Sequence, residues 1–190
     1  MLWSLLKSRL KAFREETGGT VSIEFIIMAP IIFWAYASMF SWFDAYRQVG
    51  VHQKAAFTIA DMISRETTPL DGHYIHSSRR LVQFLTRAPT LPDIRISVIR
   101  YSASRDRFFL DWSQRRGGLV ALHQRDVRNW HDKLPTMVDG ERIILVETKM
   151  DYTPPFLWGL MENHELSTFV FARPRFAPQV CFNYCRSYSY

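Results

Sequence analysis

The feature that most constrains this chain is an apolar run close to its N-terminus. The 23 residues from Val21 to Phe43 contain one ionisable side chain, that of Glu24. As an α-helix the run would be about 34 Å long, whereas the hydrocarbon core of a bilayer is about 30 Å thick. We therefore expect residues 20–43 to form a transmembrane helix that carries one carboxylate near its N-terminal edge.

The charges on either side of the run predict its orientation. Four basic residues come before it, and only Arg47 lies within the ten residues that follow. Basic residues concentrate on the cytoplasmic side of membrane proteins, so residues 1–19 are expected to be a cytoplasmic leader. A secretory signal fits poorly, because Gly18 and Gly19 come before the apolar run, whereas a signal peptide is cut after it. The four basic residues are Lys7, Arg9, Lys11 and Arg14.

A basic leader, then Gly19, then Glu24 with Phe25 beside it, all ahead of an apolar run, resembles the prepilins. More narrowly, the order resembles the TadE-like minor pilins and pseudopilins of the tight-adherence (Flp-type IVb) pilus system. The resemblance covers residues 15–66 best and includes Pro30. Beyond that it rests on general layout and on the segment 173–178.

That resemblance implies that a prepilin peptidase cuts between Gly19 and Thr20. Glu24 would then pair with the free amine of Thr20 on a neighbouring subunit. The implied partners are the prepilin peptidase, other pilins and pseudopilins, the inner-membrane pilus assembly platform and membrane lipid. The implied location is the bacterial inner membrane, in a single pass with the C-terminal domain in the periplasm.

Two other interpretations of the same residues stay open. In one, the run is a plain anchor whose Glu24 reaches the head groups, since charges are common at the edges of spans. In the other, the chain anchors a periplasmic binding or scaffold domain that never enters a filament. Pro30 removes one helix hydrogen bond, which membrane helices tolerate, and we expect it to affect only shape.

Beyond the span, the pattern predicts an α+β fold. Apolar residues at helical spacing continue to Arg65, so a stem helix is expected over residues 44–66. Pro69, Asp71 and Gly72 then mark a break. A second helix is expected over residues 74–87, and residues 119–134 suggest another that ends at Pro135. The residues expected to face the core from helix 74–87 are Ile75, Leu81, Val82, Phe84 and Leu85.

Alternating apolar and polar residues predict four strands. Residues 94–98 and 108–112 should form a hairpin, residues 141–152 give the clearest strand, and residues 168–173 the last. Gly117 and Gly118 are expected to form a turn, since the pair is too short for a phosphate-binding loop. Residues 67–190 should thus form a small antiparallel sheet domain with one or two packed helices, and it would be periplasmic.

Candidate chemistry outside the span is sparse. Cys181 and Cys185 are expected to form a disulfide in an oxidising envelope. His73 and His76 lack further ligands nearby, so no metal site is expected. No catalytic motif is present, and we expect neither an enzyme nor a cofactor. Basic residues are too scattered for nucleic-acid binding. The apolar residues 156–161 suggest a packed loop or short helix, or a partner-binding patch.

Overall fold

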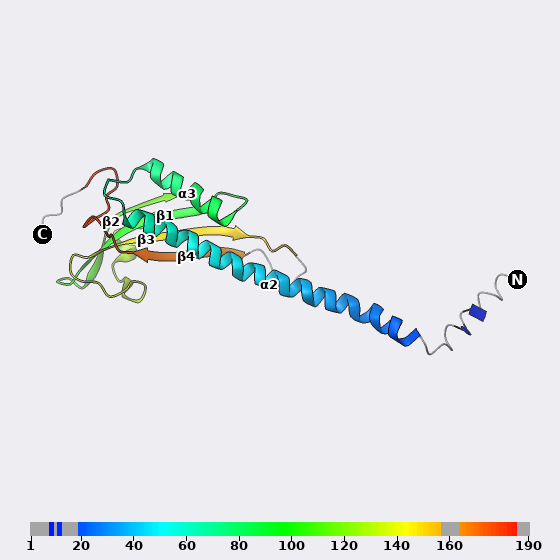
Figure 1. Ribbon diagram of the computed structural model, residues 1–190. Helices are drawn as coiled ribbons and strands as arrows, with labels where there is room; N and C mark the ends of the chain where they lie inside the picture. Colours follow the sequence, from blue (N-terminus) through cyan, green and yellow to red (C-terminus); the bar gives the residue numbers. More distant parts are fainter. Residues whose placement is uncertain (1–7, 10, 13–18, 157–163, 186–190) are drawn as a thin grey trace.

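A single long helix dominates the structure, a computed structural model that describes residues 8–9, 11–12, 19–156 and 164–185. Helix α2 (Thr20–Ser64) is 45 residues long and continues through Pro30 without a break. Its N-terminal half projects away from the rest of the chain, and its C-terminal half lies along the sheet (Figure 1). The prediction of one continuous helix through the apolar run and the stem is confirmed.

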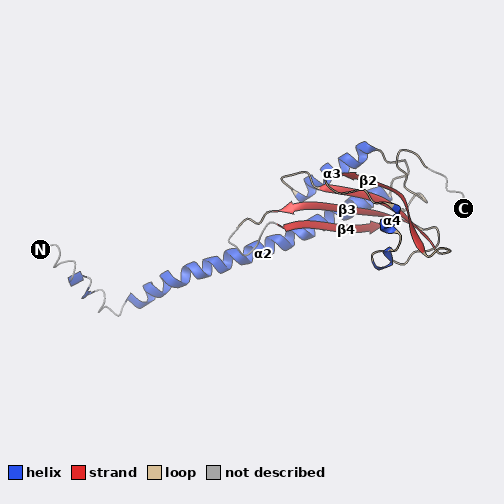
Figure 2. Ribbon diagram, turned by 180° about the vertical axis from the view of Figure 1, so that it is seen from behind, coloured by secondary structure: helices blue, strands red, loops and turns tan. Residues whose placement is uncertain are grey.

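The sheet has four antiparallel strands, as expected. They are β1 (Asp93–Ser102), β2 (Arg107–Arg116), β3 (Arg142–Tyr152) and β4 (His164–Ala172), in the order β2-β1-β3-β4. Figure 2 shows the long helix crossing one face of this sheet. Strands β1 and β2 extend beyond their predicted ranges at both ends, β4 begins earlier and ends one residue earlier, and β3 begins one residue later. Alternation marks the middle of a strand better than its ends. A long apolar N-terminal helix, an antiparallel sheet and a few short helices make the fold α+β.

The main core lies between the helices and one face of the sheet. Helix α2 contributes Ile59 and Ile63, β1 contributes Ile94 and Ile96, and β3 contributes Val146, all at most 1% exposed. Burying aliphatic side chains of this size stabilises a fold by about 1.5 to 3 kcal/mol each. The second half of α2 is therefore part of the folded domain and is fixed to it.

Helix α3 (Gly72–Thr86) covers the same face of the sheet, but its buried side differs from the prediction. Its N-cap Asp71 accepts a hydrogen bond from the Tyr74 amide. Phe84 is 79% exposed, so its expected place in the core is wrong. Serine and threonine hydroxyls take part in the buried stripe because they bond to carbonyls of their own helix. The buried residues of α3 are Ile75, Ser78, Val82 and Thr86.

The opposite face of the sheet is covered by the connection between β2 and β3, and the prediction of a helix over residues 119–134 is wrong. Only α4 (Gln124–Val127) and the 3-10 turn η2 (Trp130–Asp132) form there. The Gln124 side chain accepts a hydrogen bond from the Leu110 amide and donates one to the Phe108 carbonyl, each at 2.8 Å. Tertiary bonds to β2 thus override the helical spacing. The apolar residues of the connection still reach a second core cluster, namely Leu122, Val127, Leu134 and Met137.

The turn after β2 depends on glycine at position 117, which gives a first testable prediction. Gly117 has a φ of +96°, and an added Cβ would lie within 2 Å of an Asp93 carboxylate oxygen. We expect Gly117→Ala to destabilise the fold by about 2 to 4 kcal/mol through backbone strain and overpacking. The measurement is thermal unfolding in detergent, followed by near-ultraviolet circular dichroism.

The matched control is Gly50→Ala. Gly50 lies inside α2, and a Cβ there would meet no atom within 4 Å. Because alanine favours the helix over glycine, this variant should be stabilised by about 1 kcal/mol. Equal unfolding temperatures for the two variants would contradict the role assigned to Gly117.

Candidate functional site

The predicted processing residues lie where α2 begins. Thr20 is the first residue of the helix, and Gly19 precedes it as the N-cap, with no side-chain capping bond. A Cβ added at Gly19 would meet no atom within 4 Å. Helical termini leave their first four amides without partners in the helix, so the start of a helix opens more easily than its middle.

Glu24 and Phe25 lie just over one turn into the helix. Both side chains are exposed, and Phe25 is 71% exposed. Pro30 follows on the same helix and is also exposed. The structure thus places the motif residues on one helix that has no other part of the described chain packed around its start.

Most side chains in the apolar half of α2 are exposed. Among the described residues, α2 is the helix that is long and apolar enough to cross a membrane. Large hydrophobic side chains are exposed on every side of it, among them Ile26, Ile27, Ile31, Ile32 and Phe33, each at least 55% exposed. A soluble helix of this length would carry a polar face toward water. An apolar surface of this kind needs lipid or other apolar helices around it.

Two side chains within the apolar run are buried. Ala37 is 4% exposed and Ser41 is 3% exposed. The Phe40 ring meets the Phe156 ring edge to face, with centroids 6.1 Å apart. Phe156 follows the end of β3, so the sheet domain reaches back beside the apolar run. Residues 157–161, the rest of the predicted apolar patch, lie outside the described residues.

Where the apolar run ends and the stem begins, polar contacts join α2 to the end of β3. The Tyr152 hydroxyl donates a hydrogen bond to an Asp44 carboxylate oxygen at 2.8 Å. Arg47 pairs with the other Asp44 oxygen at 2.9 Å. Burial, together with the bond to Asp44, raises the pKa of Tyr152 to about 12. Tyr152 therefore stays protonated at neutral pH and can keep donating this bond.

A buried polar chain links the stem to two strands. His52 of α2 is 1% exposed, and its Nε2 lies 2.8 Å from the Thr148 hydroxyl of β3. The Thr148 hydroxyl lies 2.6 Å from the Thr168 hydroxyl of β4. Burial lowers the pKa of His52 to about 4, so the ring is neutral at pH 7. Sequence reasoning missed this contact, because a single histidine on a helical pattern gives no sign of its partners.

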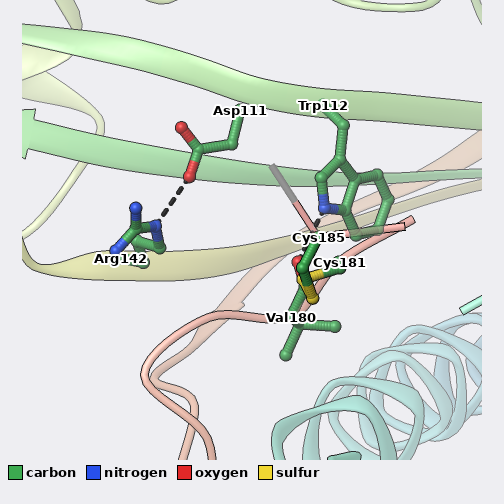
Figure 3. Close-up of a disulfide and its surroundings, with 6 residues drawn as sticks. All are labelled: Asp111, Trp112, Arg142, Val180, Cys181 and Cys185. Atoms are coloured by element: carbon green, nitrogen blue, oxygen red, sulfur yellow. Dashed lines mark hydrogen bonds and ion pairs between the residues drawn. A yellow bond between two sulfur atoms is a disulfide. The ribbon is translucent and has the colours of Figure 1, made fainter. Parts of the chain in front are cut away.

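The C-terminal segment carries a disulfide between Cys181 and Cys185. Figure 3 shows it beside Trp112, whose indole N–H donates to the Val180 carbonyl at 2.7 Å, and near the ion pair between Asp111 and Arg142. Backbone bonds join the segment to Leu70, between α2 and α3: the Leu70 amide donates to the Cys181 carbonyl at 2.9 Å. These bonds hold residues 180–183 against the domain, and the disulfide closes a short loop within the same segment.

The other residues considered from the sequence are scattered. His73 and His76 are both exposed at the start of α3, and His123 and His131 lie on the connection over the opposite face of the sheet. Within residues 19–156 and 164–185, no three His, Cys, Asp or Glu side chains come close enough together to hold a metal ion. Among the described residues, the sequence-predicted site residues that lie together are the disulfide pair and those at the start of α2, which are neighbours along one helix.

Comparisons with protein-family models, with curated protein sequences and with solved structures found no match to this chain.

Proposed function

We propose that this chain is a minor pilin-like membrane protein that takes part in assembly of a tight-adherence pilus. A prepilin peptidase removes residues 1–19, and α2 spans the inner membrane with the sheet domain on the periplasmic side. The observation that carries the proposal is the form of α2. It begins at Thr20, bears Glu24 and a bare apolar surface in its first half, and packs its second half on a sheet.

The position of Glu24 supports a role in packing between subunits. A carboxylate inside a bilayer costs about 2.5 to 3.5 kcal/mol on insertion scales, and less near the interface. A free amine at Thr20 of a neighbouring chain would offset that cost by forming an ion pair. The apolar side chains around Glu24 exclude water and strengthen such a pair. The pairing of Glu24 with this amine would act when the chain is incorporated beside other pilin helices.

The processing step gives a direct experiment. Chains isolated from cells with the peptidase should begin at Thr20, and chains from cells without it should keep the leader. Intact mass and N-terminal sequencing measure this. Gly19→Leu should retain the leader, because a bulky, helix-favouring residue would stand next to the cut bond. Gly18→Ala, one position outside the motif, is the matched control and should still be cut. A mature chain that begins anywhere other than Thr20 would overturn the processing claim.

A second candidate function is an anchored periplasmic binding or scaffold domain. An open pocket of about 330 Å³ beside the disulfide favours it, since Trp112, Gln114 and Asn183 line that pocket with aromatic and amide groups. This candidate predicts an uncut leader and full function after residues 21–43 are replaced by an unrelated span. The pilin proposal predicts that such a replacement abolishes assembly.

A further inference from the structure

The folded domain contacts α2 inside the apolar run and does not stop at its end. Phe40 lies three residues before Phe43, which is about 4.5 Å along a helix axis. Its ring meets the ring of Phe156. A bilayer that encloses residues 21–43 would therefore bring lipid close to the chain that follows β3, because Phe156 contacts the run inside its C-terminal edge.

The residues at this level suit contact with lipid. Pro154 is buried, and Phe156 is 38% exposed although it packs on Phe40. On the helix, exposed aromatic side chains follow within two turns of Phe40, namely Trp42, Phe43 and Tyr46. Aromatic side chains concentrate where hydrocarbon meets water in membrane proteins. The exposed surface beside Phe40 thus continues the apolar surface of the run.

The polar groups of the helix nearest to this level are paired. The Tyr152 hydroxyl bonds to Asp44, and Asp44 pairs with Arg47. Asp44 lies about one helical turn beyond Phe40, and Arg47 about two turns beyond it. On the helix, the change from apolar to charged side chains therefore occurs just beyond the contact between Phe40 and Phe156.

We propose that the sheet domain rests on the membrane, with Phe156 inserted beside Phe40 into the lipid leaflet on the domain's side. The occupant of this surface is lipid. The proposal rests on α2 crossing the membrane, and it holds whether or not the leader is cut or the chain enters a filament. It adds to the proposed function a fixed height and tilt for the domain, because two points on the chain enter the leaflet.

The test uses the full chain in vesicles of phosphatidylethanolamine and phosphatidylglycerol, with a nitroxide on one introduced cysteine. Cys181 and Cys185 are bonded to each other, so the introduced thiol is the one that reacts. Phe156→Cys and Pro155→Cys report on the proposed contact. Ile32→Cys reports on the span, and Ser104→Cys at the exposed β1–β2 turn reports on water. Relaxation by oxygen, which enters lipid, is compared with relaxation by a water-soluble nickel chelate.

Since water is excluded increasingly with depth in a bilayer, we expect the oxygen-to-nickel ratio at 155 and 156 to exceed that at 104 by at least about threefold and to stay below that at 32, which lies in the middle of the run. A ratio at 155 and 156 equal to that at 104 would overturn the docking. Protection of both sites from oxygen and nickel alike would mean that protein covers them, and it would also overturn the proposal. A low ratio at 32 would instead refute the span, so the two failures are distinguishable.

Circular dichroism of each labelled variant checks that the sheet is intact. Two neighbouring positions are used so that one poorly folded variant does not decide the result.

Discussion

Replacing Glu24 by alanine should leave the chain in the membrane and remove it from assembled filaments. The run then carries no charged side chain, so insertion is favoured. Under the proposed function the ion pair with a neighbouring Thr20 amine would be lost, and leaving one member of a buried ion pair without its partner costs about 3 to 5 kcal/mol. Incorporation should therefore fall by at least about tenfold, given about 1.4 kcal/mol for each factor of ten. The measurement is immunoblotting of sheared filaments against membrane fractions.

The control for this variant is Ser38→Ala. Ser38 is a polar residue of the same run, but its hydroxyl bonds to the Trp34 carbonyl of its own helix. That variant should assemble normally, and Glu24→Asp should restore part of the loss because it keeps the charge. Normal piliation with Glu24→Ala would remove the pairing role while leaving the span untouched.

The second large effect concerns acid stability and His52. The pKa of His52 is lowered by burial from 6.5 to about 4 in the folded chain. Between these two values the unfolded chain binds a proton that the folded chain does not bind, so stability falls as the pH falls. Above pH 6.5 the contribution of the neutral His52 ring to the free energy of unfolding is present in full. It should decline by about 2 to 3 kcal/mol by pH 4, at about 1.4 kcal/mol per pKa unit.

The measurement is denaturant unfolding of the full chain in detergent micelles between pH 7 and pH 4, followed by near-ultraviolet circular dichroism. Carboxylates titrate over the same range, so the quantity to compare is the slope for the natural chain minus the slope for His52→Leu. His73→Leu is the matched control, because His73 is exposed at the start of α3. If the three slopes agree, the ring of His52 is not held neutral by the fold.

Periodicity predicted most of the framework. Alternation in residues 94–98 and 141–152 identified β1 and β3, because each strand has a side fully covered by helices. Residues 119–134 carry apolar side chains at helical spacing, yet they form a mostly irregular layer over the sheet. The Gln124 side chain bonds to the backbone of β2. The spacing of residues within 119–134 carries no information about such a bond, because its partner atoms belong to a separate element.

The candidate site likewise combines residues that a local motif marks with contacts that no local motif marks. Gly19, Thr20, Glu24 and Phe25 form a local motif, and the resemblance of that motif to the prepilins is what singled them out. The contacts that attach α2 to the domain join residues about a hundred positions apart, such as His52 with Thr148 and Asp44 with Tyr152. No local signal marks such pairs.

The sequence by itself therefore determined a long apolar helix with one carboxylate near its start, because hydrophobic length and charge are properties of neighbouring residues. Only the tertiary structure decided how far the folded domain reaches along that helix. The packing of Phe156 on Phe40 depends on where β3 ends relative to α2, and that follows from the burial of the whole core.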